Sequence, residues 1–313
     1  QHSQRRNTVR DTAWASGYMA YLSSGRQLMK SSIEPRRLAA IALSMAVLAA
    51  APGARAAAPQ TQAPAAAPAS TPEADRQAQA RTIMMNMAQF LAKAPRFQVS
   101  LRAGYDAVQP SGQKVEFQEE RSVTVNRPDR LRIEGTRSDG AKVLTVFSGK
   151  EIVLVDYASK VYAVAPQPGP LDETIVYFVR DLGMRLPLAA MLLANLPADL
   201  QERVRSVDYV ELTSINGAAS HHIAARTDTV DIQMWVADGA QPLPRRVVLT
   251  YKGEQGQPQF WAEFSKWNLA PELNDAMFAA RAPEGLQKVA FAAQIARVKP
   301  AAPKAAPKKG AKQ

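Results

Sequence analysis

The sequence predicts an α+β fold, mainly β, in which one large, curved antiparallel sheet of about eleven strands carries helices over one face. Three observations predict it. Short stretches of alternating apolar and polar residues follow one another along most of the chain, as in half-buried strands. The turns between them are short, which indicates antiparallel pairing. The helical stretches fall at two places and do not alternate with strands, which excludes a doubly wound parallel sheet.

The first helix and six strands are predicted by a change of period. Apolar residues recur at helical spacing over residues 75–93, and Pro95 ends this amphipathic helix. Alternation with period two then begins, and each repeat of it is bounded by a short turn rich in Gly, Pro, Ser or Asp. The strands are expected over residues 97–105, 114–126, 130–137, 142–147, 151–157 and 160–165.

A proline-rich stretch, residues 166–170, interrupts the strands. A helix is predicted over residues 171–183, with two acidic residues in its first turn, where the helix dipole favours them. A short helix is expected over residues 188–196, after Pro187. Five further strands follow, the first two joined by an Asn-Gly hairpin turn, over residues 208–215, 220–227, 230–237, 245–252 and 259–269.

An export signal is predicted near the start of the sequence. Met29 is followed by basic residues, an apolar run of fourteen residues, and small residues ending at Ala56, the order of a cleavable signal peptide over residues 29–56. At about 1.5 Å per residue the run reaches roughly 21 Å, short of the roughly 30 Å hydrocarbon core of a bilayer. We therefore expect cleavage after Ala56, a periplasmic location and no transmembrane anchor in the mature protein.

Three other segments lack the composition of a packed core. Residues 1–28 are polar without periodic apolar positions, which predicts a disordered upstream extension. Residues 57–71 are an Ala/Pro-rich linker, and residues 292–313 are a basic tail of Lys, Pro and Ala, both expected to be extended. Residues 72–291 remain as one domain.

The net charge of +11 lies outside that domain. Residues 57–291 hold 25 basic and 26 acidic side chains, whereas the tail after them holds six basic and no acidic ones. A nucleic-acid-binding fold carries its basic patch on the folded surface, so no nucleic acid partner is expected. The tail is predicted to give weak, salt-sensitive attraction to anionic envelope surfaces.

Residues that carry catalysis or bind metals are scarce. The absence of Cys excludes disulfides, thiolate metal sites and cysteine nucleophiles. His221 and His222 are neighbours on a predicted strand, so they point to opposite faces and do not ligate one metal. The chain has no phosphate-binding loop, dinucleotide-binding glycine pattern, nucleophile elbow or zinc-protease motif. We expect no enzyme activity, no metal and no cofactor.

Two stretches carry a family resemblance. Residues 235–251 combine an Asp-Gly turn, Pro-Leu-Pro and two arginines at the start of a strand, and residues 264–267 read Phe-Ser-Lys-Trp, followed by Phe278 and Pro283. In these features the chain resembles a family of predicted periplasmic proteins of unknown function within the outer-membrane lipoprotein carrier (LolA-like) superfamily. The resemblance covers residues 75–291.

That resemblance implies a half-open β-barrel whose helices form a lid over the concave face. It also implies a soluble periplasmic binding or carrier protein that holds a lipid, a lipoprotein acyl chain or another apolar ligand between sheet and lid. The alternative is an envelope interaction or stress-sensor module that binds a protein partner through the same fold.

The candidate binding residues come from two patterns. Methionines gather on the expected lid helices, where flexible thioethers suit a variable apolar surface, although ordinary core packing explains them as well. Glu119 and Arg121 share the parity of the apolar residues on their strand, so without a bulge they face the concave side and could latch the lid or bind a polar head group; the alternative is a solvated position at the rim. The predicted ligand-binding set is Met84, Met87, Phe90, Phe117, Glu119, Arg121, Phe178, Met184 and Met191.

Overall fold

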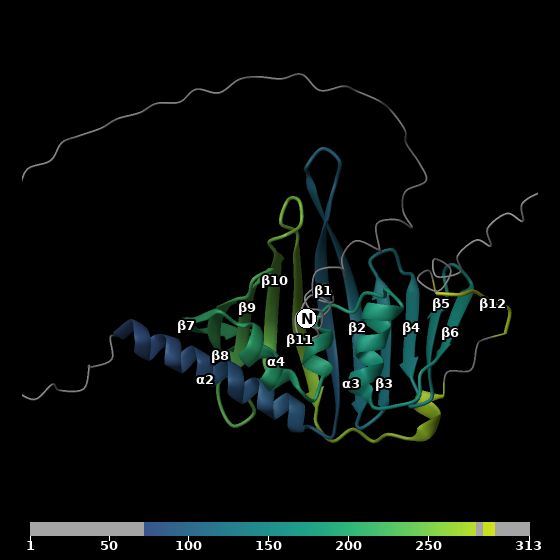
Figure 1. The fold of residues 1–313 in the computed structure, drawn as a ribbon, viewed down its shortest axis with the longest axis horizontal. Coiled ribbons are helices and arrows are strands. Elements are labelled where there is room, and N and C mark those ends of the chain that lie inside the picture. Colours follow the sequence, from purple (N-terminus) through teal and green to yellow (C-terminus); the bar gives the residue numbers. More distant parts are fainter. Residues whose placement is uncertain (1–71, 280–283, 292–313) are drawn as a thin grey trace, which may run out of the picture.

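The computed structural model describes residues 72–279 and 284–291, which form one open, curved sheet of twelve strands with helices on its concave face (Figure 1). The strand order is β12-β6-β5-β4-β3-β2-β1-β11-β10-β9-β8-β7, so the two halves of the chain meet where β1 pairs with β11. The strands are β1 (Arg96–Val108), β2 (Lys114–Asn126), β3 (Arg130–Arg137), β4 (Lys142–Phe147), β5 (Glu151–Asp156), β6 (Val161–Pro166), β7 (Ser206–Ile215), β8 (Ala218–Arg226), β9 (Val230–Ala237), β10 (Pro244–Tyr251), β11 (Gln259–Asn268) and β12 (Gln287–Lys288).

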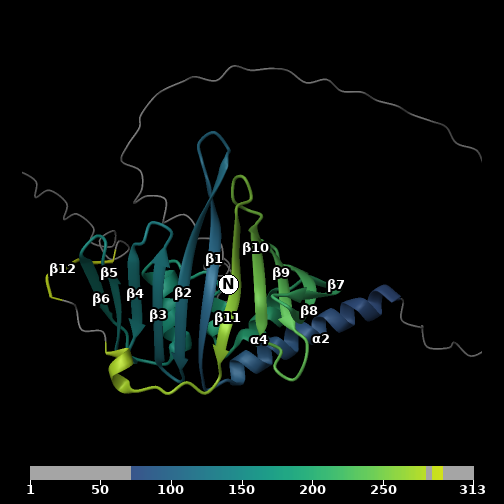
Figure 2. The ribbon, with the colours of Figure 1, turned by 180° about the vertical axis from the view of Figure 1, so that it is seen from behind.

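All helices except η4 lie along the concave face of the sheet, and the view from behind shows the strands in front of them (Figure 2). The long α2 runs beneath the second half of the sheet, and the shorter helices follow β6 (Figure 1). They are α2 (Pro72–Lys93), α3 (Leu171–Val176), the π-helix η2 (Tyr177–Asp181), the 3₁₀ helix η3 (Ala189–Leu192), α4 (Leu196–Arg203) and the 3₁₀ helix η4 (Asp275–Phe278).

The predicted fold is confirmed, and each of the eleven predicted strands is present within a few residues of its expected bounds. The additional strand is β12, a two-residue segment that pairs with β6 in parallel. Two residues carry no detectable alternation, so the sequence pattern gives no signal for it.

The helical insert differs from the prediction. The helix expected over residues 171–183 is α-helical only to Val176 and continues as a π-helix to Asp181. The helix expected over residues 188–196 was wrong, because only Ala189–Leu192 forms a turn of 3₁₀ helix and the backbone is extended at Leu193. The regular helix α4 begins later, at Leu196, with Pro in its first turn, where a missing N–H costs no helical hydrogen bond.

The main core fills the space between the concave face and the helices. On α2 the buried side chains recur every three or four residues, and on β1 they alternate, so both elements turn one apolar face toward the same volume. A smaller cluster lies on the convex side of β4–β6, where η4 covers it with Phe278.

A row of cations and indoles crosses the convex face. The guanidinium of Arg246 lies 5.6 Å from the ring of Trp235 and 5.3 Å from that of Trp261, and Arg102 lies 5.6 Å from Trp261 on its other side. Trp261 covers Gly104 so closely that a Cβ there would lie 2.5 Å from its Nε1. The row therefore depends on a residue without a side chain at position 104.

Replacing Gly104 by Ala is expected to lower the free energy of unfolding by about 1–3 kcal/mol, because the added methyl group displaces a packed ring. Urea unfolding followed by tryptophan fluorescence measures the change. Gly135→Ala is the matched control, since a Cβ there meets its nearest heavy atoms at 3.9 Å. Equal losses in both variants would show that the contact with Trp261 is not the cause.

Candidate functional site

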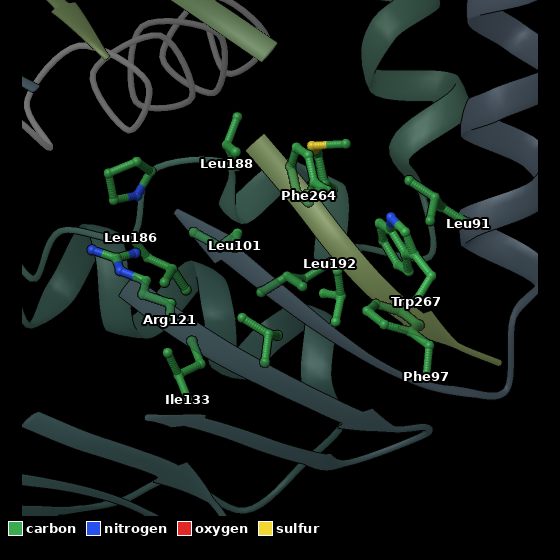
Figure 3. A pocket seen from close by; sticks show the side chains of 14 residues that line it. Leu91, Phe97, Leu101, Arg121, Ile133, Leu186, Leu188, Leu192, Phe264 and Trp267 are labelled. Atoms are coloured by element: carbon green, nitrogen blue, oxygen red, sulfur yellow. The ribbon is translucent and has the colours of Figure 1, made fainter. Parts of the chain in front are cut away.

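An apolar pocket lies between the concave face and the helical insert (Figure 3). Its floor comes from β1, β2, β3 and β11, and its roof comes mainly from the segment 186–192, which we call the cover; the cavity volume is about 40 Å³. All lining residues but one are apolar. They are Leu91, Phe97, Val99, Leu101, Arg121, Val123, Ile133, Leu186, Pro187, Leu188, Met191, Leu192, Phe264 and Trp267.

The cover is built from irregular backbone. Leu188 has a φ of 64°, in the left-handed region, and Gly183 just before the cover has a φ of 65°. For a leucine this conformation costs roughly 1–2 kcal/mol, and such strain persists only where the surroundings impose it. The π-helix η2 before the cover and the 3₁₀ helix η3 within it also lack the regular hydrogen bonding of an α-helix. The cover is therefore the part of the pocket wall with the least local stability of its own.

The pocket is closed at one end, and its other end lies toward the β1–β2 hairpin. At the closed end Phe97 is 1% exposed, and its ring lies 5.6 Å from that of Trp267. Along the same face of β2, Val123 is buried, Arg121 and Glu119 are mostly covered, and Phe117 is 43% exposed. The hairpin projects beyond the rest of the sheet (Figures 1 and 2), so the cover does not reach Phe117.

Arg121 supplies the one charged group of the pocket wall. Its Nη2 lies 2.5 Å from Oε1 of Glu119, and the two side chains are only 17% and 14% exposed. The β1–β2 ladder is continuous from Arg96 to Val108, so no bulge resets the register and both residues face the concave side. Gly135 lies opposite Arg121 on β3 and leaves room beside its side chain.

Ionic contacts tie the helical insert to the sheet near the closed end. Nη1 of Arg127, after β2, lies 3.7 Å from Oδ1 of Asp172 on α3, and the Asp172 carboxylate also accepts the backbone N–H of Ala194. Burial lowers the pKa of Arg127, and the charge of Asp172 opposes that effect. The Asp172 carboxylate offsets part of the free-energy cost of removing this guanidinium from water.

A second electrostatic contact joins the segment before the cover to the β10–β11 turn. Burial raises the pKa of Glu254 above its ordinary value, and the charge of Arg185 opposes this. Burial likewise raises the pKa of the nearby Tyr251, with Glu254 adding to the effect and Arg185 opposing it. Arg185 therefore places a positive charge close to the turn that follows β10.

The structure brings only two of the nine predicted binding residues into the pocket wall, Arg121 and Met191. Glu119 adjoins it through Arg121. The others lie elsewhere: the buried Met84, Met87 and Phe178 belong to the main core, Phe90 and Met184 pack against that core, and Phe117 stacks on Tyr105 near the hairpin tip.

Sequence reasoning missed most of the wall, and Trp267 shows why. Strict alternation places Phe264 and Trp267 on opposite faces of β11. The register with β1 shifts between Gln98 and Ser100, and Lys266 has a φ of 54°, so a bulge turns Trp267 to the concave side. There its ring stacks 5.8 Å from that of Phe264, and its Nε1 donates to the carbonyl oxygen of Pro244.

The two neighbouring histidines face opposite sides of β8. His221 contacts the Tyr209 hydroxyl and Asp238, whereas His222 stacks on Trp235 with ring centroids 4.1 Å apart. Among residues 72–279 and 284–291, no group of three His, Asp or Glu side chains has the geometry of a metal site. The different contacts of His221 and His222 confirm the expected opposite orientation of their side chains.

The chain thus folds as an open, curved antiparallel sheet with an apolar pocket under a helical cover. The chain belongs to the family described as predicted periplasmic protein (DUF2092), whose model matches residues 80–292. The resemblance to a family of predicted periplasmic proteins is therefore confirmed. In the part of the chain that the structure describes, no helix is long and apolar enough to cross a membrane.

Three solved structures illustrate the partial similarity of this chain to other proteins. The lipoprotein LppX of Mycobacterium tuberculosis is 13% identical, with 63% of this chain and 99% of that chain covered and a TM-score of 0.41. The LolA superfamily protein NE2245 of Nitrosomonas europaea is 12% identical, with 64% and 97% covered and a TM-score of 0.33. The MucA/MucB complex of Pseudomonas aeruginosa gives 15% identity, 64% and 61% coverage and a TM-score of 0.35. No curated protein shows significant similarity to the chain.

The predicted signal peptide, linker and basic tail, residues 29–56, 57–71 and 292–313, lie outside the described residues, as does the upstream extension.

Proposed function

We propose that this protein is an exported periplasmic carrier or binding protein that holds an apolar ligand, such as a lipid or an acyl chain, between the concave face and the cover. The observation that supports the proposal is the pocket itself, whose wall is apolar at every residue except Arg121. Removing apolar surface from water stabilises a bound chain by about 0.8 kcal/mol per methylene group. The predicted signal peptide, cleaved after Ala56, would deliver the protein to the compartment that its family description names.

The size of the pocket requires the cover to move. A volume of about 40 Å³ is well below the roughly 150 Å³ of an engineered cavity that admits benzene. An acyl chain therefore enters only if the cover is displaced from the sheet. The left-handed Leu188 and the adjoining short helices make the cover the wall that yields at least cost, and the unbranched side chain of Met191 adapts to the new contacts.

The test is to purify the mature protein from a periplasmic extract and analyse an organic extract of it by mass spectrometry. We expect a bound lipid in stoichiometric amount, and a rise in melting temperature when lipid is added back to delipidated protein, because a ligand that binds only the folded state stabilises it. Protein that carries no lipid and whose melting temperature does not respond to added lipid would contradict the proposal.

A protein partner is the second candidate. The strand β7 is an edge of the sheet, and its side chains Val210 and Leu212 are exposed, which is the arrangement used for binding an added strand. Cross-linking in cells distinguishes the two functions, because a sensor gives one dominant cross-linked protein and a carrier with a lipid ligand does not.

A further inference from the structure

The pocket has one polar end and one apolar end. Arg121 lies at one end beside Leu186, and the rings of Phe97 and Trp267 lie at the other (Figure 3). The strand register is consistent with these two ends. Arg121 is opposite Leu101 on β1, and Phe97 precedes Leu101 by four residues, a separation of roughly 13 Å at about 3.3 Å per residue. The charged end is the end nearer the β1–β2 hairpin, where Phe117 is exposed, so a ligand's polar group would lie toward the hairpin.

We propose that the ligand is an amphiphile with an alkyl chain and an anionic head group, and that Arg121 binds this head group. When the pocket is empty, the Glu119 carboxylate forms an ion pair with the Arg121 guanidinium in place of the head group. This inference rests on the function proposed above and specifies its ligand. A guanidinium presents paired N–H donors that match the oxygens of a carboxylate or a phosphate, so both head groups share the required chemistry.

The contacts of Glu119 support its role as a substitute for the ligand's anion. Glu119 and Arg121 are two residues apart on one strand and face the same side, and their ion pair is 2.5 Å long. Within residues 72–279 and 284–291, Glu119 is the ion-pair partner of Arg121, and no group of the cover is. A guanidinium that is mostly buried needs an anion as its partner. Arg137 lies directly opposite Glu119 on β3, so it can pair with the Glu119 carboxylate once a ligand head group has replaced that carboxylate beside Arg121.

The experiment compares three probes with the same chain length: hexadecanoate, hexadecyl phosphate and the neutral hexadecanol. Each displaces a fluorescent fatty-acid analogue from the delipidated protein at pH 7.5. In Arg121→Gln we expect the affinity for the charged probes to fall about ten- to hundredfold, the loss of a charge-assisted hydrogen bond, while hexadecanol changes less than about twofold. In Glu119→Gln the charged probes bind more tightly, because the competing carboxylate is gone. The two charged probes identify which head group is preferred.

Arg102→Gln is the matched control, because Arg102 forms an ion pair with Glu263 at 3.1 Å on the opposite face of the sheet. Arg121→Lys keeps the positive charge but loses the paired donors, so its preference for the charged probes is expected to lie between those of the wild type and Arg121→Gln. If Arg121→Gln does not fold, Arg121→Lys and Glu119→Gln supply the test. Equal affinity of the wild type for charged and neutral probes, or an equal loss for all three in the Arg121 variant, would overturn the inference and leave the proposed function standing. Failure of the wild type to bind any probe would overturn both.

Discussion

Replacing Phe97 by Ala is expected to lower the free energy of unfolding by about 3–5 kcal/mol, the loss typical of a fully buried phenylalanine. The ring is 1% exposed and lies at the closed end of the pocket, beside Trp267 and within the main core. Its removal leaves a cavity that joins the existing pocket, and the surrounding strands are too well paired to close it. Urea unfolding should show a lower midpoint with an unchanged slope, since the surface exposed on unfolding stays nearly the same.

Phe117→Ala provides the matched control on the neighbouring strand. Its side chain is 43% exposed and stacks on Tyr105 at 5.8 Å, so we expect a loss of no more than about 1 kcal/mol. A loss for Phe97→Ala as small as for Phe117→Ala would mean that the closed end of the pocket is not packed as described.

The sheet was predictable because its signals are local. Alternation marks each strand, and the short turns between strands leave antiparallel pairing as the only connection. The bounds of β2, β3, β4 and β9 agree with the prediction to the residue. The helical insert has no comparable signal: residues 182–195 depend on a left-handed Leu188 and a single 3₁₀ turn, which are imposed by contacts with the sheet rather than by the spacing of apolar residues.

The candidate site was predictable only where regular strand geometry continues into it. Parity correctly placed Glu119 and Arg121 on the concave side. The same parity placed Phe117 there, but parity does not say how far the cover extends along a strand, and Phe117 lies beyond it. Trp267 was missed because a bulge reverses its parity. Each of these differences between the prediction and the structure arises from tertiary structure, about which the two-residue periodicity of a strand carries no information.

The methionines are a second case in which the sequence pattern does not distinguish a binding site from the core. Their clustering on the helices is compatible with both a ligand surface and a core, and helical spacing does not separate the two. Met84 and Met87 are buried on α2, whereas Met191 lines the pocket from the irregular η3. The regular helix thus contributes mainly to the core and borders the cavity only through Leu91, whereas the irregular segment forms most of the roof. This division is expected of a protein that opens one wall and keeps the rest closed.

Replacing Leu101 by Trp is expected to block the pocket and to weaken binding of both charged and neutral alkyl probes by roughly fiftyfold or more. Leu101 lines the pocket floor on β1, opposite Arg121 and Phe264, and an indole there exceeds the cavity of about 40 Å³. Excluding even three methylene groups of a ligand costs about 2.4 kcal/mol at about 0.8 kcal/mol each, which gives that factor in affinity. Probe displacement measures it, and the excess volume should cost about 1–3 kcal/mol of stability.

Ser100→Trp is the control, because the adjacent residue points to the opposite face and pairs there with Ser122 and Ser265. It adds a tryptophan to the same strand without entering the pocket, so binding should stay within about twofold of the wild type. An indole can lower the affinity in two ways, and the comparison separates them. A general disturbance of β1 weakens binding in both variants, whereas occupation of the pocket weakens binding only in Leu101→Trp. Unchanged affinity in Leu101→Trp, with the fold intact, would place the ligand outside this pocket.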